Sequence, residues 1–300
     1  MGLSSYNLSL CSCISPLGKR ARIEDDGKYR DWLQQFNMLS LYLSVCEEAA
    51  RSAGKILVDM LGTTRVRHKK NPRDLVTEAD VAAQKAIESI VIGAFPDHLF
   101  IGEEDNFTPS LSPDSSEFYW IVDPLDGTTN FVHGVPCFGP SIALTRGTDV
   151  LCGVFYNPIT EEFFSAAQGQ GAFLNGKRMQ ASTCQTLGEA LVSVSFSTQV
   201  EKDSPDLLAF LKAVPASRSF RRTGSTAHNI AYVAAGRFDA FWAFACHPWD
   251  IAAGIILVKE SGGIVTKPDG SPIDFNDPSP ICAVANESLH RHLMEVFHTE

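Results

Sequence analysis

The sequence predicts two lobes, an α+β lobe over residues 31–185 followed by an α/β lobe over residues 186–300. Three patterns support this division. A helical periodicity begins near residue 32, short apolar runs separated by turns follow it, and from Leu187 onward strand and helix patterns alternate. The chain has 300 residues, 44% of them hydrophobic, so each lobe can bury a core.

Two helices are predicted near the start of the first lobe. Apolar residues recur at intervals of three and four between Trp32 and Leu61, which is the period of an amphipathic helix. Residues 65–73 are polar and basic and are predicted to form a loop. The second helix has Thr77 as its predicted N-cap and Asp80 at its third position, as in a capping box.

Strands and further helices complete both lobes. In the first lobe, strands are predicted at residues 99–102, 118–122, 138–145, 151–156 and 162–166, with antiparallel pairing and a hairpin turn at Asn175-Gly176. In the second lobe, strands are predicted at residues 190–196, 238–244 and 281–285, and helices at residues 205–213, 225–235, 248–261 and the carboxyl end.

Charge and cysteine content narrow the functional class. The net charge of −10 argues against nucleic acid and membrane partners, because both would favour a basic surface. Eight scattered cysteines without zinc-site spacing predict reduced thiols in a cytoplasmic protein. Residues 1–30 are predicted to be a disordered tail. The basic, acid-free residues 1–22 leave organelle targeting as the alternative.

The strongest functional signal is the motif Asp-Pro-Leu-Asp-Gly at residues 123–127, which follows a predicted strand. Pro124 keeps the backbone extended, so the carboxylates of Asp123 and Asp126 and the carbonyl oxygen of Leu125 can converge. Hard cations such as Mg²⁺ prefer oxygen ligands of this kind. The structural alternative is a surface turn, in which Asp and Gly are simply turn formers.

Three further acids lie at the edges of predicted elements. Glu103 ends a strand, Asp80 lies in the first turn of a helix, and Asp250 occupies the third position of a helix that begins at Pro248. Each has a structural alternative, since a carboxylate also suits a solvated strand end or the positive end of a helix. Clustered acids without a metal would repel one another, so the pattern favours a metal site.

Competing motifs fail at individual positions. Residues 171–177 spell most of a P-loop, but Arg178 replaces the required Ser or Thr, and Asn175-Gly176 predicts a hairpin instead of a helix. A calcium-binding EF-hand through Asp126 would need an oxygen ligand at Pro124.

Five motifs, in order, resemble the inositol monophosphatase family of metal-dependent, lithium-sensitive phosphatases over about residues 40–297. They are residues 74–80, 101–104, 120–134, 224–227 and 249–254 with 260–263. The resemblance implies a layered αβαβα sandwich of the inositol monophosphatase and fructose-1,6-bisphosphatase type. It also implies that a homodimer hydrolyses a small phosphorylated metabolite, inositol monophosphate above others, by in-line attack of a metal-activated water.

The same resemblance implies roles for individual residues. Two or three Mg²⁺ ions would be held by Glu103, Asp123, the Leu125 carbonyl, Asp126 and Asp250. Glu103 and Thr128 would orient the attacking water, with Asp80 nearby. The substrate would be contacted by Gly127, Thr128, Gly224, Ser225, Thr226 and Asp250.

One position departs from the family pattern. Inositol-preferring members carry a glutamate seven residues before the Trp-Asp aspartate, whereas this chain has Ala243. The apolar neighbours Phe241, Trp242, Phe244 and Cys246 predict either a buried strand or an altered substrate pocket. The alternatives are therefore a histidinol-phosphate, sugar-bisphosphate or nucleotide 3′-phosphate phosphatase, or a non-catalytic regulatory member.

Three arginines, at positions 218, 221 and 222, precede the motif at Gly224. They could reach a second anionic group of a substrate, or they could be ordinary solvated charges. The sequence alone leaves both interpretations open.

Overall fold

The computed structural model describes residues 26–63, 66–68, 75–105, 111–197, 199–275 and 278–298. The chain divides into two compact units, residues 1–37 and residues 38–300. In the first unit, the described residues form the beginning of helix α1 (Asp26–Met60), in which the rings of Trp32 and Phe36 lie 5.4 Å apart. The predicted tail falls mostly outside the described residues, and α1 begins earlier than the predicted helix.

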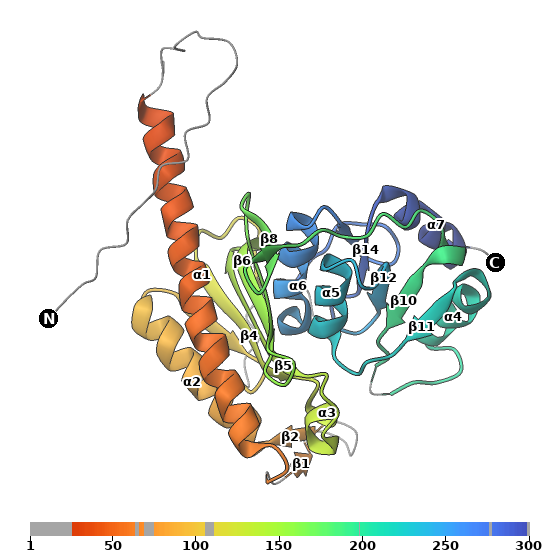
Figure 1. Cartoon of the computed structure of the whole chain (residues 1–300), viewed down its shortest axis with the longest axis horizontal. Coiled ribbons are helices and arrows are strands. Elements are labelled where there is room, and N and C mark those ends of the chain that lie inside the picture. Colours follow the sequence, from red (N-terminus) through yellow and green to blue (C-terminus); the bar gives the residue numbers. More distant parts are fainter. Residues whose placement is uncertain are drawn as a thin grey trace, which may run out of the picture. The chain divides into compact units, whose positions relative to one another are not determined.

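The second unit consists of five alternating layers of helices and sheets (Figure 1). The part of α1 after residue 38 and α2 (Glu78–Ala94) pack on one face of a seven-stranded sheet. Helices α5 (Thr226–Ala234) and α6 (Pro248–Glu260) lie between that sheet and a five-stranded sheet. Helices α4 (Pro205–Ala213) and α7 (Glu287–His298) pack on the other face of the second sheet. This arrangement confirms the predicted αβαβα sandwich.

The seven-stranded sheet has the strand order β3-β4-β5-β6-β7-β8-β9. Its strands are β3 (Leu99–Gly102), β4 (Phe118–Asp126), β5 (Gly139–Arg146), β6 (Asp149–Asn157), β7 (Glu162–Ala167), β8 (Gly171–Leu174) and β9 (Lys177–Arg178). Strands β3 and β4 run parallel, and the other neighbours are antiparallel. The predicted hairpin is confirmed, because Asn175 and Gly176 both have positive φ between β8 and β9.

Strand β4 explains why the motif region is so apolar. Tyr119 and Ile121 face the core that contains α5 and α6, whereas Trp120 and Val122 face the core that contains α1 and α2. Because helices cover both faces of the sheet, successive side chains of β4 are buried on opposite sides. Asp123 and Asp126 therefore follow directly on residues that are buried on both faces of the sheet.

The five-stranded sheet has the strand order β11-β10-β12-β14-β13. Its strands are β10 (Leu191–Val194), β11 (Ser219–Arg221), β12 (Ala240–Ala243), β13 (Ile264–Thr266) and β14 (Ile281–Val284). Strand β10 is parallel to β11 and β12, and β14 is antiparallel to β12 and β13. Because β11 leads into α5 and β12 leads into α6, both helices begin at the carboxyl ends of parallel strands.

The structure corrects the sequence predictions in several short segments. The predicted loop over residues 65–73 contains β1 (Val66–His68), which pairs with β2 (Leu75–Thr77). Strands β11 and β13 were also not predicted, and helix α3 (Thr128–His133) was not among the elements predicted from periodicity. Elements of three to six residues show too few repeats for a periodicity, and their partners in the fold stabilise them.

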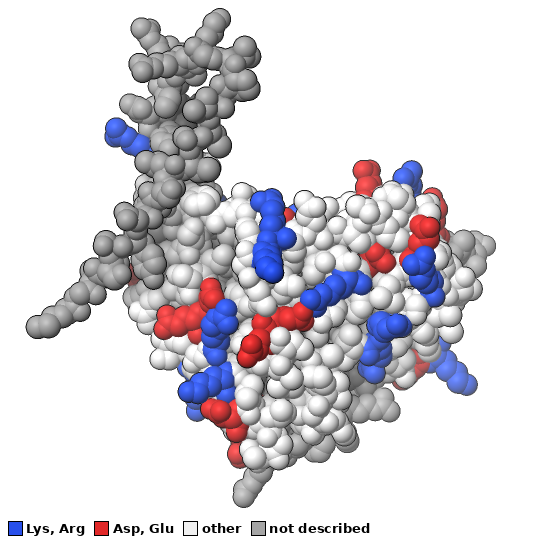
Figure 2. Space-filling view, in the orientation of Figure 1, with Lys and Arg blue, Asp and Glu red and all other residues white. Residues whose placement is uncertain are grey.

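The charged surface is mixed in sign. On the face shown in Figure 2, Lys and Arg side chains stand beside Asp and Glu side chains. Among the described helices, none combines the length and apolar character that crossing a membrane requires.

Candidate active site

The aspartate motif lies inside β4 instead of following it. The predicted strand ended at Val122, but β4 continues to Asp126 with an irregularity in its register. Asp123 lies opposite Ser141 and Asp126 opposite Gly139, so β4 has one extra residue between these pairs. The Asp123 carboxylate accepts a hydrogen bond of 2.9 Å from the amide of Leu125. The irregular register therefore sets the directions of the two carboxylates.

Helix α3 begins immediately after the motif. Its N-cap is Gly127, whose φ of 94° is strained for any residue with a side chain. A Cβ at this position would lie 2.8 Å from the carbonyl oxygen of Cys137. The Thr128 hydroxyl lies 3.2 Å from both the Leu125 carbonyl and the carboxylate of Asp80. The glycine therefore allows a tight turn that brings Thr128 back to the acids.

A network centred on Gln84 positions Glu103. This buried side chain of α2 accepts a hydrogen bond of 3.0 Å from the Glu104 amide and donates one of 2.9 Å to Asp105. Asp105 in turn accepts the amide of Gly102 at 3.0 Å. The turn that carries Glu103 is thus fixed at both ends. Sequence reasoning missed Gln84; its only signal was Gly102, where a Cβ would overlap the Gln84 side chain.

Asp80 and Asp250 are helix caps as well as members of the acidic group. One Asp80 oxygen accepts the amide and hydroxyl of Thr77 at 2.8 and 2.6 Å, and the other faces Thr128. Asp250 accepts the amide of His247 at 2.8 Å in the capping box of α6. The helix-capping interpretation is therefore correct for both, and capping fixes the orientation of each carboxylate towards the site.

Asp126 joins the first sheet to helix α5. Its carboxylate accepts hydrogen bonds from the Ser225 hydroxyl (2.5 Å), the Ala227 amide (2.6 Å) and the Thr226 amide (3.1 Å). Ser225 is also the N-cap of α5, since its hydroxyl accepts the amide of His228. Two groups predicted to contact substrate, the Ser225 hydroxyl and the Thr226 amide, thus bind Asp126.

Asn130 holds the segment before α5 against helix α3. Its side-chain amide donates to the carbonyls of Cys137 at 2.6 Å and Thr223 at 2.8 Å. Gly224 has a φ of +86°, and a Cβ there would lie 2.9 Å from the Asn130 side chain. The predicted motif at Gly224 is therefore needed for close packing, and sequence reasoning did not single out Asn130.

Asp123, the three acids around it (Glu103, Asp126 and Asp250) and the nearby Asp80 form one electrostatic group, called the acidic group. Burial raises the pKa of Asp123 well above its usual range, and the charges of Glu103, Asp126 and Asp250 raise it further. Burial raises the pKa of Asp126 to about 6, although the hydrogen bonds from Ser225, Thr226 and Ala227 lower it. Burial, with the charge of Glu103, also raises the pKa of Asp80 to about 6. The charges that act on Asp123 are all negative, so a bound cation would relieve this repulsion.

The donor chemistry suits a hard divalent cation. Carboxylates from β3–β4, β4 and α6 and the Leu125 carbonyl supply oxygen only, as Mg²⁺ prefers. Among the described residues, no three His, Cys, Asp or Glu side chains are arranged so that they could hold a metal ion as they stand. The acids influence one another's charge, and they differ in how many of their oxygens already accept hydrogen bonds from the protein.

The model of the inositol monophosphatase family matches residues 38–300. The chain belongs to the inositol monophosphatase family. Inositol monophosphatase 2 of Solanum lycopersicum is 42% identical over 238 residues, which cover 78% of this chain and 90% of that protein. The Nus factor SuhB of Pseudomonas aeruginosa is 40% identical over 235 residues, covering 76% of this chain and 86% of that protein.

A solved structure of the same family supports the fold directly. The extragenic suppressor protein suhB of Bartonella henselae matches with a TM-score of 0.78 and 36% identity, over 85% of this chain and 98% of that chain. Inositol monophosphatases are metal-dependent phosphoric monoester hydrolases that act on small phosphorylated substrates. The chain is therefore a member of an enzyme family.

The position that departs from the family pattern is buried. Ala243 ends β12 with 2% of its surface exposed, and Phe241 and Trp242 before it are fully buried. The buried-strand interpretation is thus correct for these residues. The Trp242 carbonyl accepts the amide of Ser195 at 3.2 Å, which continues the pairing of β12 with β10 towards the site.

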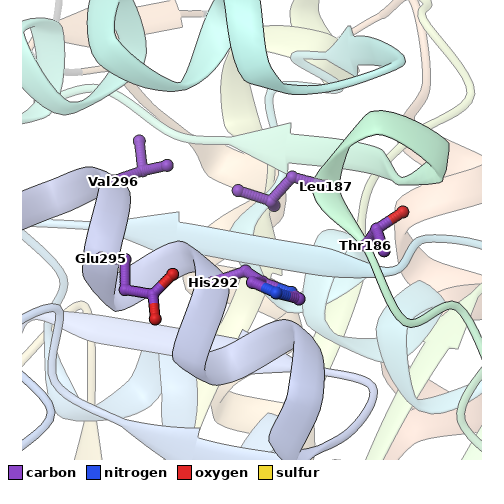
Figure 3. A pocket seen from close by; sticks show the side chains of 5 residues that line it. All are labelled: Thr186, Leu187, His292, Glu295 and Val296. Carbon is purple, nitrogen blue, oxygen red and sulfur yellow. The ribbon is translucent and has the colours of Figure 1, made fainter.

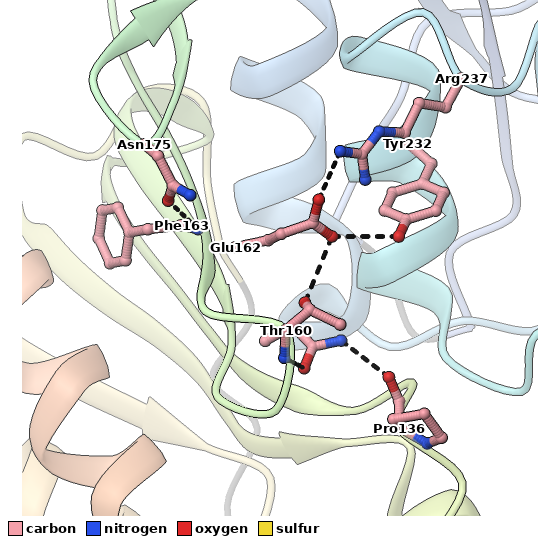
Figure 4. A network of polar contacts seen from close by, with 8 residues as sticks. Pro136, Thr160, Glu162, Phe163, Asn175, Tyr232 and Arg237 are labelled. Atoms are coloured by element: carbon pink, nitrogen blue, oxygen red, sulfur yellow. Dashed lines mark hydrogen bonds and ion pairs between the residues drawn. The ribbon is translucent and has the colours of Figure 1, made fainter.

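In this inositol monophosphatase family member, Glu162 of β7 binds residues of helix α5 and of the turn after it (Figure 4). Its carboxylate accepts hydrogen bonds from the hydroxyls of Tyr232 (3.1 Å) and Thr160 (3.3 Å) and from the guanidinium of Arg237. Tyr232 stacks edge-on against His228, with ring centres 4.2 Å apart. These contacts fix helix α5, whose first turn binds Asp126.

We predict that His228 makes the protein less stable in mild acid. Burial lowers the pKa of its imidazole to about 4, and neither ring nitrogen has a hydrogen-bond partner among the described residues. Between pH 6.5 and 4 the unfolded chain therefore binds a proton that the folded chain excludes, so stability falls as the pH falls. From pH 7 to pH 5 the loss is about 2 kcal/mol.

Denaturant titrations of the wild type and His228→Phe at both pH values would measure this loss. The acids of the site also titrate, but they do so in both proteins, so the difference between the two isolates His228. An identical pH dependence in the two proteins would contradict the prediction.

A separate hollow of about 290 Å³ lies between Thr186 and Leu187 on one side and α7 on the other (Figure 3). Its lining residues are Thr186, Leu187, His292, Glu295 and Val296. Leu187 precedes β10 at its amino end, whereas the acidic group lies near the carboxyl ends of the parallel strands. This hollow is therefore not part of the candidate active site.

Proposed function

We propose that the chain hydrolyses a small-molecule phosphate monoester with Mg²⁺, and that inositol monophosphate is its first candidate substrate. The observation that carries this proposal is the buried Asp123 surrounded by the charges of Glu103, Asp126 and Asp250. Membership of the inositol monophosphatase family supports the same reaction. A fold that keeps several repelling carboxylates together needs a compensating cation, and a phosphate dianion needs one as well.

The proposed Mg²⁺ ligands are Glu103, Asp123, the Leu125 carbonyl, Asp126 and Asp250. They fit the ion because all of them offer oxygen and because Asp123 and Asp126 are buried, with the charges of Glu103 and Asp250 acting on Asp123. When bound, Mg²⁺ would lower the pKa of a water molecule and neutralise charge on the phosphate and the leaving group.

The chain's own residues would position the reactants. Glu103 and Thr128 would orient the attacking water, since Thr128 lies beside Asp80 and the Leu125 carbonyl. The amides of Gly127 and Thr128, at the beginning of α3, would donate to phosphate oxygens. Gly224 and Thr226, whose hydroxyl donates to the Ser195 hydroxyl, would contact the substrate. Attack in line with the leaving group would need no covalent phosphoenzyme.

The 40% identity with a Nus factor favours a second candidate, a regulatory protein without catalysis. The acids argue for the enzyme, because a binding protein gains nothing from buried carboxylates that repel one another. Ala243 keeps histidinol phosphate, sugar bisphosphates and nucleotide 3′-phosphates as alternative substrates.

Phosphate release from a panel of phosphomonoesters tests the proposal. The panel contains inositol 1-phosphate and the three alternative substrate classes, with and without Mg²⁺ and with added Li⁺. We expect release that requires Mg²⁺ and that Li⁺ inhibits. Turnover at full rate in EDTA would refute the mechanism, and no turnover of any compound would favour the regulatory candidate.

A further inference from the structure

Strands β10 and β12 end side by side, and Ser195 is the first residue after β10. The last paired residues of the two strands are Val194 and Trp242, and the amide of Ser195 donates to the Trp242 carbonyl at 3.2 Å. The register therefore continues by one residue, which places Ser195 beside Ala243 at the end of β12. Both residues lie at the carboxyl ends of parallel strands, as do the beginnings of α5 and α6.

The side chain of Ser195 faces α5 and α6, the helices that separate the two sheets. Val192 and Val194 belong to the core that contains α4 and α7, whereas Ala243 belongs to the core that contains α5 and α6. Because successive side chains of a strand alternate between its two faces, Ser195 faces the same way as Ala243. A direct contact agrees with this direction, since the hydroxyl of Thr226, the first residue of α5, donates to the Ser195 hydroxyl at 3.2 Å.

Thr226 connects Ser195 to the acidic group in a single step. Its amide donates to the Asp126 carboxylate at 3.1 Å, while its hydroxyl donates to Ser195. The loop between β12 and α6 also lies near the acids. Burial raises the pKa of the Cys246 thiol in this loop well above its usual range, and the charges of Asp250 and Asp126 raise it further. Ser195 therefore lies at the edge of the candidate active site, separated from Asp126 by one residue.

The Ser195 hydroxyl keeps its own hydrogen available for a ligand. A serine hydroxyl has one donor and two acceptor sites. The Ser195 oxygen accepts the Thr226 hydroxyl, and among the described residues no group accepts the Ser195 hydrogen. The Ser195 side chain is partly exposed, whereas its neighbour Ala243 is buried and has no polar side-chain atom. Of this aligned pair, Ser195 alone can therefore hydrogen-bond a ligand, with its oxygen held in place by Thr226.

We propose that Ser195 is a specificity-determining residue, whose hydroxyl donates a hydrogen bond to an oxygen on the alcohol part of the substrate. This inference rests on the proposed function. The ester phosphate lies at the acidic group, and the alcohol part of a small monoester can span the single residue between Asp126 and Ser195. A site that hydrogen-bonds a substrate oxygen discriminates against an analogue that lacks it, because the protein group is then left unpaired. The favoured substrates are phosphate monoesters of alcohols that carry further hydroxyl groups.

Two pairs of probe substrates test this inference at saturating Mg²⁺. Inositol 1-phosphate and cyclohexyl phosphate have the same carbon ring, with and without further hydroxyl groups. Glycerol 2-phosphate and isopropyl phosphate provide the same contrast on a short carbon chain. Ser195→Ala should lower the ratio of kcat/KM for the hydroxylated probe to that for its hydroxyl-free partner about 3- to 10-fold in at least one pair, mainly through the KM of the hydroxylated probe.

Ser193→Ala is the matched control. Ser193 lies on the same face of β10, and its buried hydroxyl donates to the Ala240 carbonyl at 3.4 Å. This variant removes one hydroxyl from the same strand, and its ratios should equal those of the wild type. Ser195→Thr keeps a hydroxyl and should recover most of the lost ratio. Unchanged ratios in Ser195→Ala, or an equal fall in Ser193→Ala, would overturn the inference.

Failure of the proposed function gives a different result. In that case the wild type releases phosphate from none of the probes, and titration calorimetry of the two hydroxylated probes with Mg²⁺ takes the place of turnover. Weaker binding to Ser195→Ala than to Ser193→Ala then supports the role of Ser195. Equal binding to the two variants, or no binding to the wild type, overturns it.

Discussion

Asp123→Asn is expected to abolish magnesium-dependent phosphate release and to stabilise the metal-free protein. Activity should fall at least about 1,000-fold, because the buried charge at the centre of the acidic group is lost. Stability should rise because burial and the charges of Glu103, Asp126 and Asp250 raise the pKa of Asp123. In acid, Asp123 is protonated and neutral, and the folded protein keeps its full stability. As the pH rises through the raised pKa, the carboxylate becomes charged and this stability is lost. Asn is neutral at every pH and therefore avoids the loss.

Melting temperatures in EDTA and in Mg²⁺ measure the second half of this prediction. Each kcal/mol gained should raise the melting temperature by about 2–4 °C. Mg²⁺ should stabilise the wild type and leave Asp123→Asn unchanged. Lower stability of Asp123→Asn than of the wild type in EDTA would contradict the electrostatic account, and retained turnover would contradict the assignment.

Glu260→Gln is a suitable control for removing a carboxylate. Glu260 lies at the other end of α6 from Asp250 and accepts the amides of Gly169 and Gly171, each at 2.7 Å. Its substitution removes a negative charge without touching the acidic group. It should therefore reduce stability, since one amide loses its acceptor, and preserve magnesium-dependent turnover.

Asp126→Asn is expected to abolish phosphate release as well, at any practical Mg²⁺ concentration, but with a different effect on stability. Ser225, Thr226 and Ala227 all donate to the Asp126 carboxylate, and an amide offers one accepting oxygen instead of two. One donor at the beginning of α5 is left without an acceptor, which costs about 1–3 kcal/mol. This loss offsets the gain from removing a carboxylate whose pKa is raised to about 6.

Comparing the melting temperatures of Asp123→Asn and Asp126→Asn tests both predictions. In EDTA, Asp126→Asn should melt at a lower temperature than Asp123→Asn, although both lack turnover. The same order should appear in the denaturant midpoint. Equal melting temperatures would show that the bonds to α5 contribute little to stability, and measurable turnover in Asp126→Asn would refute its assignment as a metal ligand.

Local sequence signals were sufficient for the main elements of the fold. The capping box at Thr77 and Asp80 and the hairpin at Asn175-Gly176 both depend on residues close together in the chain, and both are present. The Asp123 motif and the capping acid Asp250 were found for the same reason. The roles proposed for these acids at a metal ion stay predictions.

Contacts between distant segments could not be read from the sequence. Gln84 looks like an ordinary residue on a helix, yet it holds the turn around Glu103 across about 20 positions of the chain. Asn130 reaches the carbonyl of Thr223, and Asp126 reaches Ser225, across still longer separations. Hydrogen bonds between residues so far apart leave no repeating pattern in the sequence. They can be recognised only in the folded structure.

The middle layer, formed by α5 and α6, has a consequence for how this family can diversify. Ten of the thirteen residues of α6 are buried, and its core contacts reach both sheets. Any local loosening of these helices would disrupt the hydrophobic core that joins the two sheets. Asp250 at the beginning of α6 and Asp126, which binds the beginning of α5, are therefore held as rigidly as that core. Substitutions in the loops at the strand ends should therefore reduce stability less than substitutions in α5 and α6. One catalytic frame can thus acquire new substrates by exchanging only its periphery.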